Sequence, residues 1–342
     1  MKTALITGIS GQDGAYLSKH LLENNYRVIG CDRRTSSGSL WRLEELGISR
    51  AVEIEDFELG EFTNIFRVID KAEPDEIYNL AAQSFVAASF EMPTYTSNIT
   101  GLGASRILEA IRQINPKIKF YQASSSEMFG KVKEMPQNEH TPFYPRSPYG
   151  VAKLFAHWMT VNYREAYNLF ACSGILFNHE SPLRGEEFVT RKIIKGLIDI
   201  KKGRLEKLEL GNMDAKRDWG FAGDYVEGMH LMLQHSQADD YVLATGQTNS
   251  VKDFINCAVK LLDIRIEWEG ESDYTKAINI DTNKTIISTN EKYYRPSEVD
   301  VLLGDASKAK SLLNWRPKVN FPNLVLQMVE GELDRNNNRG RA

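Results

Sequence analysis

Apolar and polar positions along the first half of the chain alternate between short apolar runs and longer helical patterns. Short apolar runs bounded by turn residues predict buried strands, and apolar residues three and four positions apart predict amphipathic helices. The predicted strands are 3–7, 26–31, 51–54, 76–80, 119–123 and 169–177. The predicted helices are one through Leu17 and Leu22, then 61–72, 99–114 and 148–168. This alternation predicts an α/β fold with a doubly wound parallel sheet.

The second half has fewer strand patterns and more polar loops. A helical pattern at 223–233 and a strand pattern at 241–244 indicate that the chain returns to the main sheet. We expect a sheet domain and a smaller, mixed α/β C-terminal substrate domain. The sheet domain comprises 1–178 with a return segment at about 215–248, and the smaller domain comprises 179–214 and 249–330. The stretch 269–292 is predicted to be irregular, and the polar tail 331–342 is predicted to be disordered.

The composition is that of an ordinary globular protein, with 42% hydrophobic residues, 26% charged residues and a net charge of −4. This charge balance excludes a general nucleic-acid binder, and an anionic substrate would need cations placed locally. The three cysteines, Cys31, Cys172 and Cys257, lack the spacing of a disulfide framework or a zinc site. They fit a reducing cytoplasm, and no metal centre is expected. No apolar stretch reaches the length of a membrane span, so we expect a cytoplasmic protein without a membrane partner.

Three glycines, Gly8, Gly11 and Gly14, follow the first strand, and a helical pattern and the second strand come next. Strand, glycine turn, helix and strand in this order are the context of a dinucleotide-binding fingerprint. The glycines permit a tight turn and let the backbone approach a pyrophosphate at the positive end of the helix. We therefore expect a Rossmann-type sheet with a dinucleotide site.

Charged residues follow the second strand, where the adenosine ribose of a dinucleotide is bound. An acidic residue such as Asp32 would hold the 2′-hydroxyl of NAD, whereas Arg33 or Arg34 would pair with the 2′-phosphate of NADP. The two arginines favour NADP, and Asp32 leaves NAD as an alternative. Asp56 and Phe57 lie just past the third strand and could contact the adenine, although Asp56 could equally be a polar strand end.

Small residues end the fourth predicted strand and leave space for a cofactor at the carboxyl edge of the sheet. They include Leu80, Ala81, Ala82 and Ser84. The fifth strand runs into three serines and a carboxylate, in which Ser125 could hydrogen-bond the oxygen being oxidised and Glu127 could act as an acid or base. The alternative interpretation of this serine cluster is a turn or helix cap.

Tyr149 and Lys153 lie four residues apart on a predicted helix, so both side chains share one face. A Lys153 ammonium beside the Tyr149 phenol would favour the phenolate and lower the pKa of the phenol. Such a phenol could take a proton from an alcohol while a hydride leaves it. The alternative is an ordinary solvated helix face.

Cations recur on the loops of the second half, at Lys192, Arg217 and Arg295. Each one alone fits a surface charge. Together with a nucleotide-binding fold, they indicate a second diphosphate to be neutralised.

The glycine loop contains a Gln12-Asp13 insert, and a Phe-Asn-His-Glu-Ser-Pro run occupies 177–182. With 7–17, 124–130 and 141–149, these stretches resemble the GDP-mannose 4,6-dehydratases, a family of extended short-chain dehydrogenases. The similarity runs from residue 2 to about 330.

The resemblance implies a redox-neutral dehydration of a GDP-sugar with tightly held NADP. Tyr149 would deprotonate the sugar 4-hydroxyl while a hydride leaves C4, and Lys153 would lower the Tyr149 pKa and hold the nicotinamide ribose. Glu127 would remove the C5 proton and help water leave from C6. Return of the hydride to C6 would give a 4-keto-6-deoxy sugar.

The resemblance also implies a set of binding residues. Cofactor contacts are expected from Gly8, Gly11, Gln12, Asp13, Gly14, Arg33, Arg34, Ser36, Asp56, Phe57, Leu80, Ala81, Ala82, Ser84, Tyr149, Lys153, His179 and Arg184. Substrate contacts are expected from Ser84, Ser125, Glu127, Tyr149, Asn178, Val189, Lys192, Arg217, Arg295 and Glu298. In relatives the loop around Ser36 reaches across a tetramer interface, which implies a homo-oligomer, either a tetramer or a dimer.

Three alternative functions stay open. Ser125 stands where the family usually has threonine, and the smaller side chain could accommodate a GDP-manno-heptose in the same reaction. A GDP-sugar epimerase or 4-reductase could use the same fold, although neither needs the carboxylate of Glu127. A dinucleotide sensor without catalysis would keep the glycine loop but not the four residues Ser125, Glu127, Tyr149 and Lys153.

Overall fold

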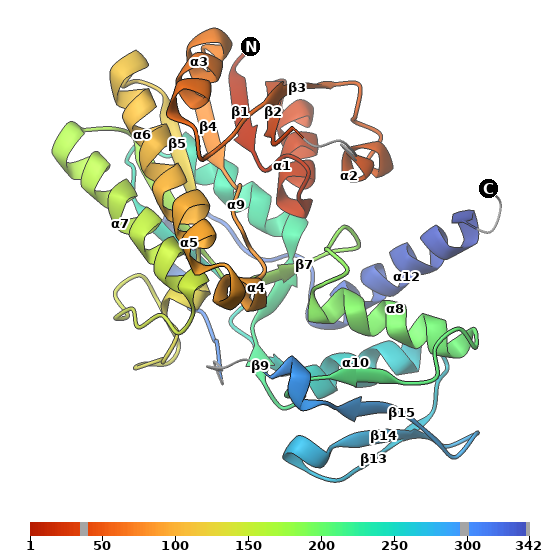
Figure 1. Ribbon diagram of the computed structural model, residues 1–342. Helices are drawn as coiled ribbons and strands as arrows, with labels where there is room; N and C mark the ends of the chain where they lie inside the picture. The colour runs from red at the N-terminus through yellow and green to blue at the C-terminus, as the bar shows by residue number, and fades with distance from the viewer. Residues whose placement is uncertain (35–39, 295–300, 340–342) are drawn as a thin grey trace.

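A seven-stranded parallel sheet forms the centre of the computed structural model, which describes residues 1–34, 40–294 and 301–339 (Figure 1). Its strands are β1 (Thr3–Thr7), β2 (Arg27–Asp32), β3 (Val52–Asp56), β4 (Glu76–Asn79), β5 (Lys119–Ser125), β6 (Ala171–Leu176) and β11 (Asp240–Leu243). They lie in the order β3-β2-β1-β4-β5-β6-β11, which reverses between β1 and β4. Doubly wound sheets bind ligands at such a reversal, beyond the carboxyl ends of the strands.

Helices cover both faces of the sheet (Figure 1). One face carries α3 (Phe62–Ala72), α6 (Gly103–Ile114) and α7 (Pro148–Tyr167), and the other carries α1 (Gln12–Glu23) and α9 (Ala222–Gln234). Leu5 and Ile29 pack with the first layer, whereas the adjacent Ile6 and Val28 pack with the second. Strands β1, β4 and β6 are therefore buried almost throughout, whereas the edge strand β3 is polar and largely exposed. The predicted Rossmann-type parallel sheet is confirmed.

A smaller α/β layer lies below the main sheet in Figure 1. Its mixed sheet has the order β13 (Ile266–Glu269), β14 (Lys276–Asn279), β15 (Lys284–Thr289) and β8 (Leu208–Leu210). Around it lie α8 (Val189–Lys201), α10 (Val251–Leu261) and α12 (Phe321–Arg339). Ile194, Phe254 and Leu324 join these helices in one buried cluster. The exact boundaries of the two domains stay a prediction.

Further short elements lie in the connections between these strands and helices. The strands are β7 (Asn178–Glu180), β9 (Lys216–Arg217), β10 (Trp219–Phe221) and β12 (Asn249–Ser250), and the helices are α2 (Trp41–Glu45), α4 (Val86–Glu91), α5 (Pro93–Thr96) and α11 (Ser307–Leu312). Among the described residues, no helix combines the length and the apolar character that crossing a bilayer requires.

Two predicted elements differ from the structure. The helix predicted at 99–114 begins as a π-helical segment, Ser97–Leu102, and continues as α6. This segment lies close to α7, since a Cβ on Gly101 would be 3.3 Å from the Phe155 ring. The stretch 269–292 is not irregular, because β14 and β15 pair within it as antiparallel strands.

The tail also differs from the prediction. Helix α12 continues to Arg339, so the expectation of a disordered tail at 331–342 is wrong for residues 331–339. Glu332 is 2% exposed, and it pairs with Arg191 and Arg335 at 3.2 Å. These polar residues have folded partners far away in the sequence, which a local composition cannot reveal.

Candidate active site

The glycine turn packs against the end of β4 and leaves no room for side chains. Gly8 has a φ of 71°, and a Cβ there would lie 2.9 Å from the Ala81 backbone. A Cβ on Gly14 would lie 2.5 Å from the Gly8 carbonyl oxygen. The Thr7 hydroxyl oxygen holds this junction, because it accepts hydrogen bonds from the N–H groups of Leu80 and Ala81 at 3.1 Å. Helix α1 begins directly after the turn, which gives the turn the positive helix end that favours phosphate.

A buried chain of hydrogen bonds, which we call the amide chain, runs from Thr7 through Asn79 and Gln122 to Lys153. The Thr7 hydroxyl donates to Asn79 Oδ1, and Asn79 Nδ2 donates to Gln122 Oε1, both at 2.8 Å. Gln122 Nε2 donates to the Ala123 carbonyl oxygen at 2.9 Å, and Lys153 Nζ donates to the same oxygen at 2.6 Å. All five residues are at most 7% exposed. The chain therefore ties the ends of β1, β4 and β5 to the predicted catalytic lysine.

Ser125, Glu127 and Tyr149 meet at the carboxyl end of β5. Ser147 caps α7 by accepting a hydrogen bond from the Gly150 N–H at 3.0 Å. A Cβ on Gly150 would lie 2.8 Å from the Glu127 carbonyl oxygen, so the start of α7 lies directly against this segment. The Tyr149 phenol hydrogen-bonds the Ser125 hydroxyl, and the charge of Glu127 acts on the phenol. The structure thus brings three of the predicted catalytic side chains together.

The electrostatics of Tyr149 differ from the sequence prediction. Burial raises the pKa of the Tyr149 phenol, and the charge of Glu127 adds to this, although the Ser125 hydrogen bond and the charge of Arg184 oppose it. Lys153 Nζ lies 5.8 Å from the centre of the Tyr149 ring and donates to a backbone carbonyl of β5 instead. Burial also lowers the pKa of Lys153 to about 8. In this arrangement burial, Ser125, Glu127 and Arg184 set the pKa of Tyr149, so the lowering of that pKa by Lys153 stays a prediction.

A half-buried ion pair joins the glycine turn to the loop after β6. His179 Nε2 lies 2.8 Å from Asp13 Oδ2, and His179 Nδ1 lies 2.7 Å from the Phe177 carbonyl oxygen. Both contacts favour a ring that donates from both nitrogens, which is the cationic form of the imidazole. Burial opposes both charges, but their mutual attraction raises the pKa of His179 and lowers that of Asp13. Gln12 strengthens the junction by donating to the His179 carbonyl oxygen and accepting from Ser181 Oγ, each at 2.8 Å.

These residues fit a nicotinamide dinucleotide. The glycine turn and the start of α1 suit its pyrophosphate. Among the described residues, Asp13 Oδ1 and Asn178 Oδ1 are buried oxygen atoms without a hydrogen-bond partner, so they could accept hydrogen bonds from a bound ligand. Lys153 supplies a buried cation beside Tyr149.

The predicted ribose side of the site is open to solvent. Arg33 and Arg34 are exposed, and Arg33 Nη1 donates to the Tyr95 hydroxyl at 2.8 Å. Asp32 Oδ1 accepts a hydrogen bond from the Arg33 N–H at 2.8 Å. Ser36 lies outside the described residues.

The remaining predicted cofactor residues at the sheet edge differ in exposure. Asp56 and Ser84 are exposed, and Leu80, Ala81 and Ala82 are half-buried. The Phe57 ring is 4% exposed and packs in the core with Leu59 and Ile65. The ring therefore has a packing role, which the sequence prediction did not include.

The predicted residues that follow β6 lie on β7, in the next loop and at the start of α8. Arg184 places its guanidinium 3.5 Å from the centre of the Phe188 ring, and its Nε lies 3.1 Å from Glu180 Oε2. Its charge reaches the Tyr149 phenol, as noted above. Asn178 begins β7, and Val189 begins α8 with 37% of its surface exposed.

Two predicted substrate cations, Lys192 and Arg217, lie on α8 and β9. Lys192 Nζ donates to a carbonyl oxygen of β8 at 2.8 Å and lies 3.5 Å from the centre of the Tyr293 ring. Burial lowers the pKa of Lys192. Arg217 is 7% exposed on β9, and the preceding residue of β9 forms a bridge with Val301. Outside the described residues lie Arg295 and Glu298.

Nearly the whole chain is similar to one group of known proteins. A family model described as GDP-mannose 4,6 dehydratase matches residues 5–328. The chain belongs to this family. A GDP-mannose 4,6 dehydratase from Homo sapiens is 50% identical over 340 residues, which cover 97% of this chain and 91% of the relative. A GDP-mannose 4,6-dehydratase from Sinorhizobium fredii (strain HH103) is 49% identical over 339 residues, which cover 97% of each chain. The predicted family is confirmed, and these names do not favour the GDP-heptose alternative.

More distant solved structures share the fold of the GDP-mannose 4,6 dehydratase family member described above. A dTDP-glucose 4,6-dehydratase from Bacillus anthracis, in complex with NAD, has a TM-score of 0.81 at 20% identity and covers 98% of each chain. The structure of RMD from Pseudomonas aeruginosa, complexed with NADPH, has a TM-score of 0.77 at 20% identity and covers 98% of this chain and 100% of that chain. At these identities the likeness shows the fold.

Sequence reasoning missed the side chains that connect the predicted site residues of this GDP-mannose 4,6 dehydratase family member. Asn79 and Gln122 belong to no motif, and both stand at buried positions of their strands. A polar side chain in a strand buried on both faces needs a partner, and this is the signal that could have identified them.

Proposed function

We propose that this chain is a GDP-mannose 4,6-dehydratase, which converts GDP-mannose to its 4-keto-6-deoxy derivative with loss of one water. The cofactor would be NADP, which when bound accepts a hydride from C4 and later returns it to C6. The sugar is oxidised at C4 and reduced at C6, so the reaction needs no external oxidant.

Tyr149 would handle the proton of the sugar 4-hydroxyl, with Ser125 holding the same oxygen. Because burial raises the pKa of Tyr149, the phenol is protonated at neutral pH in the arrangement described. To accept a proton it needs a nearby cation, and Lys153 can supply one by turning its ammonium from the Ala123 carbonyl toward the phenol. The amide chain fixes the position from which Lys153 makes this movement.

The position of Glu127 is the observation that carries the proposal. Glu127 is 8% exposed at the carboxyl end of β5, and its charge acts on the Tyr149 phenol. A ketone at C4 acidifies the C5 proton, and Glu127 would remove that proton and then protonate the departing 6-hydroxyl. An enzyme that only oxidised C4 would not need this second acid–base group.

The test is the substitution Glu127→Gln, with Glu134→Gln as a matched control on an exposed side chain. We expect Glu127→Gln to slow formation of the dehydrated sugar by at least about 10²-fold, the usual scale for a lost acid–base group. Mass spectrometry of the products from GDP-mannose measures this, while thermal unfolding checks the fold. Undiminished dehydration by Glu127→Gln would refute the assigned role.

We propose NADP rather than NAD because two arginines are available at the ribose side. The Asp32 carboxylate accepts a hydrogen bond from its own neighbour's N–H, whereas Arg33 and Arg34 are exposed. Identifying the nucleotide released by denaturing the purified protein tests this choice. In addition, Arg33→Ala should lower the affinity for NADP more than that for NAD.

The GDP-sugar would be held on the side of the smaller sheet. Lys192, which lies beside the Tyr293 ring, and Arg217, which is 7% exposed on β9, would neutralise its diphosphate. The other proposed substrate contacts are Ser84, Asn178, Val189, Arg295 and Glu298. Lys192→Ala should raise the KM for GDP-mannose while leaving the affinity for the cofactor unchanged.

We also propose a cytoplasmic homo-oligomer, with the outer face of α7 as the contact between two copies. Val151, Phe155 and Trp158 lie on one stripe of α7 and are 53%, 42% and 54% exposed, and Leu102 of the adjoining π-helical segment is 45% exposed. A second copy presenting the same stripe would bury these residues. The double substitution Phe155→Asp with Trp158→Asp should reduce the mass measured by light scattering.

A further inference from the structure

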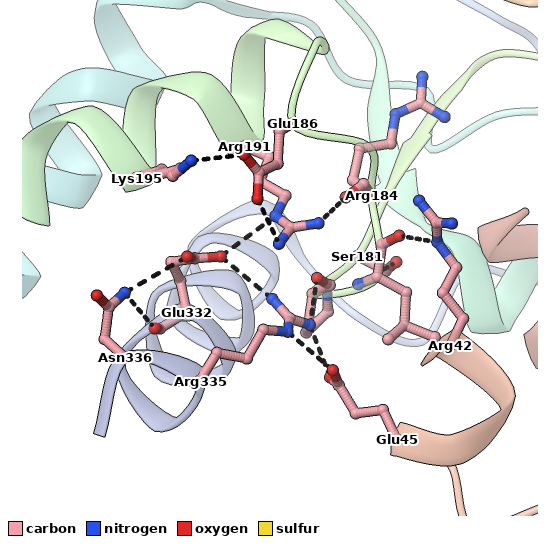
Figure 2. Close-up of polar contacts among 12 residues, drawn as sticks. Arg42, Glu45, Ser181, Arg184, Glu186, Arg191, Lys195, Glu332, Arg335 and Asn336 are labelled. Atoms are coloured by element: carbon pink, nitrogen blue, oxygen red, sulfur yellow. Dashed lines mark hydrogen bonds and ion pairs between the residues drawn. The ribbon is translucent and has the colours of Figure 1, made fainter. Parts of the chain in front are cut away.

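The loop at 181–184 is held through its backbone by three arginines. The carbonyl oxygen of Pro182 accepts from Arg335 at 2.6 Å, and that of Leu183 accepts from Arg42 at 2.6 Å. The next carbonyl oxygen, of residue 184, accepts from Arg191 at 2.5 Å. These guanidinium groups come from α12, α2 and α8, as Figure 2 shows. Three successive carbonyls are therefore bound to three elements that lie far apart in the sequence.

Carboxylates and one indole ring fix the three arginines in place. Arg191 pairs with Glu332 at 3.2 Å, and Arg335 pairs with Glu45 at 2.6 Å (Figure 2). The Trp41 ring centre lies 4.5 Å from the Arg42 guanidinium carbon, and 5.4 Å and 5.2 Å from those of the other two arginines. Such stacking on an indole face adds an attraction that holds the guanidinium groups in position.

Arg42 is distinct because it also binds the glycine turn. Its Nη1 donates to the Ser10 carbonyl oxygen at 2.7 Å, while its Nε donates to Leu183. Burial, followed by the charge of Arg191, lowers the pKa of Arg42 to about 10, so the guanidinium remains charged at neutral pH. One cation thus spans the two segments that border the dinucleotide site.

The loop carries groups that face this site. Ser181 donates to Gln12 of the glycine turn, and the preceding His179 pairs with Asp13. Figure 2 shows the Arg184 guanidinium directed away from the three arginines that hold the loop backbone. The charge of Arg184 reaches the Tyr149 phenol. A shift of the loop would therefore displace His179 and Arg184 together.

We propose that Arg42 is a positioning residue for dinucleotide binding, which together with Arg191 and Arg335 holds the 181–184 loop against the glycine turn. The proposal rests on the proposed function, since it assumes a nicotinamide dinucleotide between these segments. The hydrogen bonds within the loop are short-range. For example, the Arg184 N–H donates to the Ser181 carbonyl oxygen at 3.1 Å. Arg42 and Arg335 supply the long-range anchors that a loop outside a sheet does not obtain from backbone pairing, and Arg191 adds one from the helix that follows.

The test compares Arg42→Met, Arg42→Lys and the control Arg265→Met in the full chain. Arg265 forms an exposed ion pair with Asp281, so its loss should change neither measurement below. After removal of bound nucleotide, titration with NADPH gives the Kd, and hydrogen exchange of amides 184–188 without nucleotide reports on the loop. We expect Arg42→Met to weaken NADPH binding about tenfold or more and to accelerate exchange of these amides. In Arg42→Lys the ammonium can reach the carbonyl of either Ser10 or Leu183 but not both. This variant should therefore give an intermediate Kd and an intermediate exchange rate.

A different result would overturn the proposal. If Arg42→Met lowers the Tm but leaves the Kd and the exchange of amides 184–188 unchanged, Arg42 serves folding stability alone. If the unsubstituted protein fails to bind NADPH, the proposed function is wrong, and unchanged exchange in Arg42→Met would separately reject the positioning role. Should Arg42→Met fail to fold, Arg335→Lys carries the same comparison, because it removes the bidentate pair with Glu45 while keeping a charge.

Discussion

Two regions of the candidate site are held in place by different chemistry. In the amide chain, neutral side chains on paired strands run across the sheet from Thr7 to Gln122, and the chain ends at the Lys153 ammonium. The 181–184 loop depends on charged groups, namely the Asp13–His179 pair and three arginines on successive carbonyls.

The difference follows from what the backbone already provides. Strand ends are positioned by the hydrogen-bond ladder of the sheet, so neutral amides are sufficient to fix the remaining side-chain freedom. A loop without ladder partners must satisfy its carbonyls otherwise, and hydrogen bonds from cations are about twice as strong as neutral ones. We therefore expect changes in the amide chain to affect catalysis, and changes around the loop to affect cofactor affinity and its pH dependence.

The largest effect is expected for Lys153→Met, which removes the cation at the end of the amide chain. Turnover should fall by about 10²-fold or more, because Tyr149 loses the nearby cation it needs as a base. The Kd for NADPH and initial rates with GDP-mannose separate binding from turnover. A variant with nearly full turnover would contradict the role of Lys153.

The same substitution should stabilise the fold at neutral pH. The folded-state pKa of Lys153 is about 8, below its ordinary 10.5, so folding opposes protonation of this side chain. The penalty is complete below about pH 8 and disappears as the pH rises toward 10.5, which corresponds to at most about 3 kcal/mol. Unfolding by urea at several pH values should show Lys153→Met to be more stable than the unsubstituted protein below about pH 8, with the gap closing at higher pH.

A smaller effect is expected for Gln122→Leu, which interrupts the amide chain without removing a charge. The Asn79 amide loses its acceptor, which should cost about 1–3 kcal/mol of stability. Lys153 loses part of its fixed position, so kcat should fall about tenfold while the Kd for NADPH changes little. Gln113→Leu, on an exposed face of α6, is the matched control. Equal losses in kcat and in NADPH affinity would contradict the expectation that the amide chain affects catalysis and the loop affects cofactor affinity.

Asp13→Asn should alter pH dependence on the loop side. The raised pKa of His179 means that the pair stabilises the fold below the ordinary pKa of 6.5, and that this contribution is lost as the pH rises through the folded value. The lowered pKa of Asp13 means that the contribution is also lost in acid, below the ordinary 3.8. The pair is therefore strongest between these two values. Tm measured from below pH 3.8 to above pH 6.5 should fall at both ends, and Asp13→Asn should remove this pH dependence, while its kcat at saturating cofactor changes less than its affinity for NADPH.

The smallest effect is expected for Ser181→Ala, which removes one neutral hydrogen bond to Gln12. The cost should be about 1 kcal/mol, since the arginines still hold the adjacent carbonyls. Thermal unfolding and NADPH titration would detect it. A loss as large as that of Arg42→Met would show that the loop depends on Ser181 rather than on the arginines.

The sequence predicted the parallel sheet and the place of the site, because both follow from local patterns. Apolar runs separated by helical periods define the Rossmann-type sheet, and the glycine turn defines the point where its order reverses. Tyr149 and Glu127 were expected in one site because their motifs resemble those of a known family.

The partners of the predicted residues could not be derived in the same way. The spacing of Tyr149 and Lys153 predicts a shared helix face, but the lysine ammonium binds the Ala123 carbonyl, and its direction depends on tertiary packing. Asp13 and His179 were both expected at the cofactor, yet their mutual ion pair joins residues 166 positions apart. The tail was expected to be disordered because its composition is polar, and only the folded partners of Glu332 explain its helix.

The reach of α12 has a consequence for the order in which the site is assembled. Arg335 pairs with Glu45 across 290 positions, whereas β1 to β6 are complete by residue 176. During synthesis the parallel sheet can therefore pair while α12 does not yet exist, and contacts between such distant segments form late because closing a long loop is entropically costly. The glycine turn would then be in place before the 181–184 loop receives its last anchor. A nascent chain would acquire its phosphate-binding turn early, and its complete cofactor pocket only when α12 docks.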